Sequence, residues 1–326
     1  MVDLSTRYLG LPLRNPLVVS ASPMTRSLDK AKSLEDAGAG AIVMHSLFEE
    51  ELLVARRLNT PSPVGSETTA SSRRFDFVEK HLEDASRLCD AISIPVIGSI
   101  NGTTCSDWLT SAQALAQAGV NAIELNIYHI PVDVDETSND VEQRYYKILR
   151  SVIRQVDIPV TLKLSPYLSA PISFIRHLER IGAKGVSVFD RFFQPDIDIH
   201  SLQPSQKVSL SNPDEALSRI RWLALLRPHI SISLAATGGF HRAEEIIKAL
   251  LAGADAVQMC SVLLTAGPSY LGVILEELEH WCLEHEYSSL SSFRSSLAVS
   301  SFLAGEQYAR SSYVNLLDRY HNEEFE

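Results

Sequence analysis

A short apolar strand pattern recurs along this sequence in two alternating forms, and it constrains the fold more than any other feature. In the first form a helical segment ends at glycine and a buried strand follows, as in AGVNAIELNI from Ala118. In the second a polar residue or an Ile-Pro pair precedes the strand, as in DIPVTLKLSP from Asp157. The two forms alternate from RNPLVVSASP at Arg14 to AGADAVQMCS at Ala252, which predicts eight strands.

Segments with helical periodicity lie between and after these strands: Leu28–Ala37, Phe75–Ala91, Ser106–Ala118, Val141–Val156, Ser173–Ile181, Pro213–Leu226, Arg242–Ala252 and Tyr270–Glu284. Glycines with the positive φ of a helix end are expected after four of them, at Gly38, Gly119, Gly182 and Gly253. Strand and helix in eightfold alternation require parallel pairing through right-handed crossovers. The count favours a closed (β/α)₈ barrel, a TIM barrel, over an open sheet. SASPMT, after the first strand, lacks the GxGxxG of an open dinucleotide-binding sheet.

Four segments fall outside the repeat. Residues 1–13 predict a short hairpin that closes the bottom of the barrel, and the tail from about 285 to 326 predicts a helical extension. Long loops are expected after strand two, at Phe48–Arg74, and after strand six, at Phe192–Leu210, where lids and substrate contacts are often found. We therefore predict one domain over residues 1–326, with its core at about 14–284.

Charge and composition exclude several classes of function. The net charge of -11 opposes binding to nucleic acid or to an anionic membrane. The four cysteines form no CxxC pair and no metal-ligand spacing, so neither a metal centre nor an iron–sulfur cluster is expected. We find no signal peptide and no apolar run of about 18 residues, which predicts a cytoplasmic protein with reduced thiols.

Polar residues collect at the carboxyl ends of the predicted strands, which in a barrel all meet at the mouth where active sites lie. In strand order they are Ser20–Ser22, His45 and Ser46, Ser99 and Asn101, Asn126 with Tyr128 and His129, Lys163, Asp190 and Arg191, Thr237–Gly239, and Cys260 with Ser261. A single polar strand end means little. Eight of them together predict a binding site.

The end of strand seven, AATGGFH, predicts a phosphate site. Gly238 and Gly239 stand where the strand turns toward a helix that begins near Arg242, so their backbone amides can approach an anion. The amides of Cys260 and Ser261 lie after strand eight, and the loops after these two strands are the recurrent phosphate site of this fold. A phosphorylated ligand is therefore expected.

Lys163 has two possible uses in such a mouth. A desolvated lysine can attack a carbonyl and form a Schiff base. A protonated lysine can instead lie by a flavin ring and stabilise its anionic reduced form. The spacing of residues leaves both open.

The residues described above, taken with their order, resemble the dihydroorotate dehydrogenase family of FMN barrels from about Tyr8 to Tyr270. The motifs that carry the resemblance are LGLPLRNPLVVSAS, SINGTT, ELN, TLKLSPY and ATGGFHRAEEIIKALLAGADAVQM. The resemblance implies an FMN site built from Ala21, Ser22, His45, Ser46, Asn101, Asn126, Lys163, Asp190, Gly238, Gly239, Cys260 and Ser261. In it Lys163 would bind the ring, and the last four would hold the phosphate. It also implies a homodimer.

This sequence departs from the family pattern mainly where the family binds orotate. His45 stands in place of a lysine, and His129 falls on the position of the cysteine or serine base. Pro131 replaces an asparagine that grips orotate, and Asp190 with Arg191 replaces an asparagine followed by a small hydroxyl residue. SETTASSRR stands where an asparagine-rich loop is usual. The cofactor half of the site is thus retained and the orotate half is rebuilt.

The leading hypothesis is an FMN-dependent oxidoreductase of pyrimidine metabolism. It would transfer a hydride between flavin N5 and a CH–CH or C=C substrate, such as a dihydropyrimidine, and pass electrons to a small acceptor or another subunit. His129 is the first candidate for the acid or base, with Tyr128 and His45 after it. The alternatives are a Schiff-base lyase that uses Lys163 on a phosphorylated substrate, and a barrel that binds FMN or phosphate without catalysis.

Overall fold

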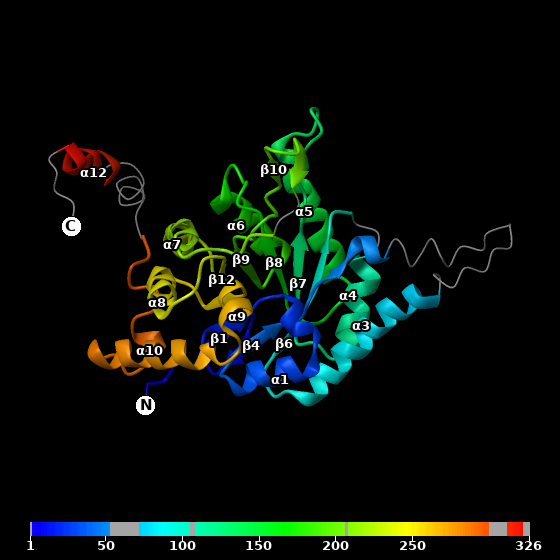
Figure 1. Cartoon of the computed structure of the whole chain (residues 1–326), viewed down its shortest axis with the longest axis horizontal. Coiled ribbons are helices and arrows are strands. Elements are labelled where there is room, and N and C mark those ends of the chain that lie inside the picture. Colours follow the sequence, from blue (N-terminus) through cyan, green and yellow to red (C-terminus); the bar gives the residue numbers. More distant parts are fainter. Residues whose placement is uncertain (1, 53–71, 105–107, 206–207, 300–311, 322–326) are drawn as a thin grey trace.

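The computed structural model describes residues 2–52, 72–104, 108–205, 208–299 and 312–321 (Figure 1). The chain folds into a closed parallel barrel of eight strands with helices around it, as predicted. The barrel strands are β3 (Leu17–Val19), β4 (Ala41–Val43), β6 (Val96–Gly102), β7 (Ala122–Ile127), β8 (Val160–Leu164), β9 (Gly185–Val188), β12 (Ser233–Thr237) and β13 (Ala256–Met259). Pairing of β13 with β3 and of β4 with β6 closes the ring, while β5 (Leu47–Phe48) adds to β6. The strands read as continuous apolar runs because both of their faces are covered.

The main helices are α1 (Leu28–Asp36), α3 (Ser72–Ala91), α4 (Trp108–Gln117), α5 (Ser138–Ile153), α6 (Pro171–Ile181), α7 (Glu215–Leu226), α8 (Ala243–Ala252) and α10 (Tyr270–Glu284). Gly38, Gly119, Gly182 and Gly253 have φ of 97 to 123°, as expected of helix ends. Helix α7 begins later than predicted, at Glu215, because Pro213 lies in the preceding turn, where its carbonyl accepts a hydrogen bond from the Ala216 amide.

The predicted N-terminal hairpin closes the barrel at its amino end. Strands β1 (Thr6–Tyr8) and β2 (Leu11–Leu13) pair antiparallel, and Tyr8, Leu9 and Leu13 are buried in one cluster with inward side chains of the barrel strands. A Cβ at Gly185 would lie 2.5 Å from the Leu9 side chain, which shows how closely the hairpin packs into the barrel.

The insertion after β9 contains a second antiparallel hairpin, β10 (Asp196–Asp198) with β11 (Gln203–Ser205). Figure 1 shows it on the side of the barrel to which the strands point. Most of the predicted loop after strand two, residues 53–71, lies outside the described residues, and so does Cys105.

The chain after α10 packs first against the barrel without forming a long helix. Phe293 is buried beside Trp281, with ring centroids 5.2 Å apart. The amides of Ser295 and Leu297 each donate a 2.9 Å hydrogen bond to a carbonyl at the end of α8. The short η3 (Leu290–Ser292) lies in this segment, and α12 (Ser312–His321) follows later. Among the described helices, we find none long and apolar enough to cross a membrane.

Candidate active site

A cavity of about 240 Å³ opens at the carboxyl ends of the strands, and we call it the mouth pocket. Its lining brings together predicted site residues that are far apart in the sequence: Ala21, Lys163, Asp190, Gly238, Gly239, Cys260 and Ser261. They follow or end strands β3, β8, β9, β12 and β13. The barrel therefore joins the predicted lysine and the predicted phosphate turn in one site.

Lys163 is the buried cation of the mouth pocket. Its ammonium Nζ donates a 3.1 Å hydrogen bond to the Ser20 hydroxyl and lies 3.5 Å from Oδ1 of Asp190. Burial lowers the pKa of Lys163, but the carboxylates of Asp190 and Glu124 outweigh burial and raise that pKa above its ordinary value. The side chain is thus held as an ammonium.

Asn126 extends this cluster across the barrel. Its Nδ2 donates a 3.0 Å hydrogen bond to Oδ2 of Asp190, so the β7 amide and the β8 lysine share one carboxylate from the end of β9. The buried Oδ1 of Asn126 has no hydrogen-bond partner among the described residues. A buried acceptor without a partner is costly, and a bound ligand with an N–H group would satisfy it.

The turn at Gly238 and Gly239 needs glycine for two reasons. Both residues have positive φ, 89° and 90°. A Cβ on Gly239 would lie 2.4 Å from the backbone nitrogen of Ala216, at the start of α7. The turn therefore presents bare backbone next to the pocket, which suits close approach of a phosphate.

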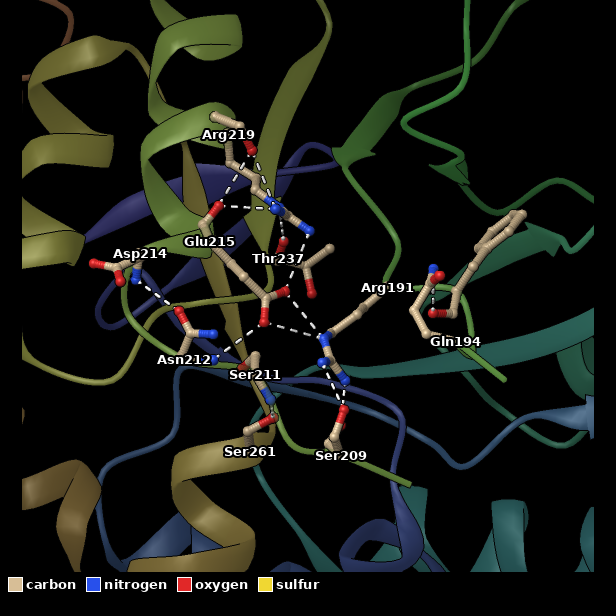
Figure 2. Close-up of polar contacts among 12 residues, drawn as sticks. Arg191, Gln194, Ser209, Ser211, Asn212, Asp214, Glu215, Arg219, Thr237 and Ser261 are labelled. Atoms are coloured by element: carbon tan, nitrogen blue, oxygen red, sulfur yellow. Dashed lines mark hydrogen bonds and ion pairs between the residues drawn. The ribbon is translucent and has the colours of Figure 1, made fainter. Parts of the chain in front are cut away.

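A polar network that no sequence motif indicated supports this turn (Figure 2). The Glu215 carboxylate accepts hydrogen bonds from Nε of Arg191 at 3.0 Å and from the Asn212 amide at 3.2 Å. Arg219 donates 2.8 Å and 3.3 Å hydrogen bonds to the carbonyls of Glu215 and Thr237. The network ties α7 to the end of β12 and places two arginines near the pocket.

One further wall of the mouth pocket comes from the end of the insertion after β9. The Ser211 amide donates a 3.1 Å hydrogen bond to the Ser261 hydroxyl, and Nη2 of Arg191 donates to the Ser209 hydroxyl at 3.2 Å (Figure 2). Sequence reasoning missed these serines because Ser209 lies in an insertion without periodicity and Ser211 directly follows it.

His129 lies in a different cavity, of about 420 Å³, which shares no lining residue with the mouth pocket. Its Nε2 is 2.9 Å from both carboxylate oxygens of Glu136, and Arg144 binds the same carboxylate at 3.0 Å. The structure therefore places His129 outside the lining of the mouth pocket and gives it an acidic partner. Glu136 was not anticipated, although it follows His129 by only seven residues.

Tyr128 joins two of the loops above the barrel. Its ring stacks on Phe192, with centroids 4.1 Å apart, and its hydroxyl accepts a 2.7 Å hydrogen bond from the Phe193 amide. Tyr167 meets Phe192 edge-on at 6.0 Å. We call Tyr128, Tyr167 and Phe192 the aromatic bridge, because they connect the loops after β7, β8 and β9.

The structure does not bring His45 into the mouth pocket. It lines a third cavity, of about 420 Å³, on the side of α1 and α3, where its Nε2 lies 3.0 Å from Nδ1 of His81. Burial lowers the pKa of His45 to about 4 and that of His81 to about 3. His81 belongs to a helix, and no feature of the sequence linked it to His45.

The remaining predicted residues lie around the strand ends. Ser22 caps the short η1 (Pro23–Arg26), and its hydroxyl accepts a 3.3 Å hydrogen bond from the Met24 amide. Ser46 and Ser99 are buried with their hydroxyls 2.8 Å apart. Asn101 stands beside Asn126 in the register of β6 and β7. None of these four predicted residues, Ser22, Ser46, Ser99 and Asn101, lines the mouth pocket.

A model of the dihydroorotate dehydrogenase family matches residues 3–282 of this chain. The chain belongs to the dihydroorotate dehydrogenase family. Its relatives include catalytic subunits of dihydroorotate dehydrogenase B (NAD(+)) from three bacteria. The one from Geobacillus kaustophilus is 26% identical over 79% of this chain and 84% of the relative, and the one from Bacillus pumilus 24% over 88% and 94%. The one from Listeria innocua is 26% identical over 91% and 99%.

Members of this family are FMN-binding flavoproteins and oxidoreductases that act on CH–CH donors. The residues of the mouth pocket suit both the phosphate end and the ring end of FMN. The bare Gly238–Gly239 turn suits the phosphate, and the Lys163 ammonium suits a ring that carries carbonyl oxygens. Asn126 does not line the pocket but is bonded to Asp190, which does, and its unsatisfied Oδ1 suits an N–H group. This dihydroorotate dehydrogenase family barrel is thus an FMN-dependent oxidoreductase.

Proposed function

We propose that this chain transfers a hydride between flavin N5 and a CH–CH or C=C bond of a small substrate, such as a dihydropyrimidine. The observation that carries the proposal is that Lys163 and Asp190 share one pocket with the Gly238–Gly239 turn in a chain of this family. Asn126 is joined to this pair through its hydrogen bond to Asp190. FMN supplies the two-electron chemistry when it is bound.

In this proposal the barrel holds the cofactor through two kinds of contact. The Lys163 ammonium stabilises negative charge on the ring, and the amides of Gly238, Gly239, Cys260 and Ser261 hold the phosphate. Ala21 and Ser22 contact the edge of the ring. Ser46, Asn101, Asn126 and Asp190 complete the wall, and His45 keeps at most an indirect part because it faces His81.

His129 stays our first candidate for the group that exchanges a proton with the substrate, and Tyr128 is second. Because Nε2 of His129 faces Glu136, the proton would be exchanged at Nδ1, and the carboxylate would orient the imidazole. The test is the rate of flavin reduction in a single turnover of His129→Ala. We expect a loss of at least about 100-fold, the usual contribution of a general acid or base; a rate within a few-fold of the parent removes His129 from the mechanism.

The relatives are named for dihydroorotate and NAD(+), but the substrate half of this chain argues for another substrate. Pro131 cannot offer the amide that an asparagine would, and Asp190 brings a negative charge to the pocket. A site that binds a planar carboxylate prefers it because polar side chains hydrogen-bond to it. When those side chains are removed, the preference in binding free energy falls by several kcal/mol, which is about the cost of leaving polar groups unpaired. We therefore propose an uncharged dihydropyrimidine over dihydroorotate.

The Schiff-base lyase is disfavoured by the state of Lys163. A lysine that attacks a carbonyl must lose its proton, whereas the carboxylates of Asp190 and Glu124 raise the pKa of Lys163. Borohydride trapping of a substrate on Lys163 in colourless protein would support the lyase hypothesis instead.

The experiment that tests the proposal is the visible spectrum of the purified protein, followed by a substrate screen under single-turnover conditions. We expect flavin absorbance, release of FMN on heating, and bleaching by an uncharged dihydropyrimidine faster than by dihydroorotate. Flavin that no dihydropyrimidine, quinone, fumarate or NADH reduces or reoxidises would point to a binding barrel. The relatives are named as catalytic subunits, so acceptors should be tried with and without a second subunit. A cytoplasmic location and a homodimer stay predictions.

A further inference from the structure

Asp190 lies in the wall of the mouth pocket, and its carboxylate also contacts the groups that would hold the flavin ring. It is buried at the end of β9, and both of its carboxylate oxygens are engaged. Oδ1 lies 3.5 Å from the Lys163 ammonium, and Oδ2 accepts the hydrogen bond from Nδ2 of Asn126 at 3.0 Å. A single carboxylate therefore contacts both side chains that are expected to face the flavin ring.

The charges around Asp190 show what this contact does. Lys163 has a second carboxylate in range, since the side chain of Glu124 is also buried inside the barrel and acts on the same ammonium. The nearby Arg191 and Arg219 share the single carboxylate of Glu215, at 3.0 Å and 3.8 Å, which offsets one of their two positive charges. The Asp190 and Glu124 carboxylates that act on Lys163 thus offset its single positive charge.

The offset of the Lys163 charge affects how strongly the reduced form of a bound flavin is stabilised. Reduction of the ring adds two electrons and one proton, which together leave it with one negative charge. A free ammonium nearby would favour the reduced form, and a carboxylate that offsets the ammonium removes that preference. An asparagine at position 190 could make the same hydrogen bond to Asn126 without offsetting the charge of Lys163.

We propose that Asp190 lowers the midpoint potential of FMN bound in the mouth pocket, by offsetting the positive charge of Lys163. The inference rests on the proposed function, because it requires the ring to lie beside Lys163. It makes the reduced flavin of this chain a stronger electron donor, so transfer to a C=C substrate or an acceptor is favoured over uptake of electrons from a CH–CH donor.

The test compares Asp190→Asn and Asp190→Ala with the parent. Asp190→Ala is included because an amide at position 190 could point a second donor at the Lys163 ammonium. Asp36→Asn is the matched control, since it removes the same charge from an exposed residue at the end of α1, away from the mouth. Each holoprotein is titrated spectroscopically for its midpoint potential against a reference dye. Each is also titrated with sulfite, whose sulfur lone pair bonds to flavin N5 and leaves the ring with a negative charge.

We expect either Asp190 variant to bind sulfite at least tenfold more tightly than the parent. We also expect it to favour reduced over oxidised FMN by a similar factor, which corresponds to about 30 mV for a two-electron couple. The Asp36→Asn control should match the parent in both titrations. A merely structural role for Asp190 would not move these two readouts together.

Two results would overturn the inference. One is unchanged potential and sulfite affinity in variants that retain FMN. The other is loss of FMN from both variants while they stay folded by circular dichroism, which would make Asp190 a residue that holds the ring. Failure of the proposed function looks different, because the parent protein would then bind no flavin or would not exchange electrons with any substrate.

Discussion

Two regions at the carboxyl ends of the strands, which we call the cofactor half and the loop half of the mouth, are built in different ways. The half that holds Lys163, Asn126 and the Gly238–Gly239 turn comes from the ends of barrel strands and is buried. The half that holds Tyr128 and His129 comes from loops that touch one another through side chains. Loop residues nearby are very exposed, with Val134 at 96% and Ile197 at 70%. A barrel can therefore keep its cofactor chemistry while its loops change the substrate.

The strongest test of this difference is Lys163→Met. It leaves the Asp190 carboxylate buried without its cation, which should lower the free energy of unfolding by about 3 to 5 kcal/mol, as is typical of broken buried ion pairs. FMN should also be lost. Urea unfolding and the visible spectrum measure the two effects. The double variant Lys163→Met/Asp190→Leu should recover most of the stability but not the flavin; recovery of FMN would mean that Lys163 does not bind the ring.

The next test is Gly239→Ala, because a Cβ there meets the backbone at 2.4 Å and φ is positive. We expect a loss of about 3 kcal/mol in the free energy of unfolding from the combined strain and clash, with FMN bound at least tenfold more weakly. Gly10→Ala is the matched control, since Gly10 has a φ of 80° and, among the described residues beyond its two chain neighbours, no atom lies within 4 Å of the place its Cβ would take. It should cost about 1 kcal/mol and leave FMN binding unchanged. Equal losses in the two variants would show that the turn needs positive φ only.

The next prediction concerns the pH dependence of stability that the His45–His81 pair should cause, and it tests whether His45 takes part in binding the cofactor. Both pKa values lie below the ordinary 6.5 in the folded protein, so the unfolded chain binds more protons as pH falls through 6.5. The stability from the neutral pair is present above about pH 6.5 and is lost progressively toward pH 4. A single histidine with such a shift loses about 2 kcal/mol between pH 7 and pH 5, and the less buried His45 contributes less than His81. We therefore expect about 3 kcal/mol less stability at pH 5 than at pH 7 from the pair, measured by urea unfolding.

The variant His81→Phe should flatten that pH dependence and leave the affinity for FMN unchanged. If a His45→Gln variant instead loses FMN at neutral pH, His45 contributes to FMN binding.

The smallest expected effect is in the loop half. Tyr128→Phe removes the hydroxyl that accepts a hydrogen bond from the Phe193 backbone amide. Loss of this bond should change the free energy of unfolding by no more than about 1 kcal/mol. FMN binding should not change, while amide exchange at Phe193 should speed up and the KM for substrate should rise. Tyr313→Phe, on an exposed face of α12, is the control. Loss of FMN from Tyr128→Phe would contradict the division of the mouth into two halves.

Much of the site could be predicted because parallel strand ends must meet. Once eight strands alternate with helices, Lys163, Gly238 and Ser261 share one mouth whatever the loops do. The contacts that orient these residues could not be predicted from the sequence. Asp190 meets Asn126 across an intervening strand, and Glu215 meets Arg191 from a helix 24 residues later. Nothing in the local spacing of these residues indicates either pair.

By itself the sequence determined the barrel, its floor and the glycine turn, because periodicity and positive φ are local properties of a chain. The directions of the strand-end side chains depend instead on contacts between distant parts of the chain. His45 turned to His81, His129 turned to Glu136, and Lys163 acquired Asp190. The physical reason is that charge and hydrogen bonding are settled between residues distant in sequence, after the backbone has brought them together.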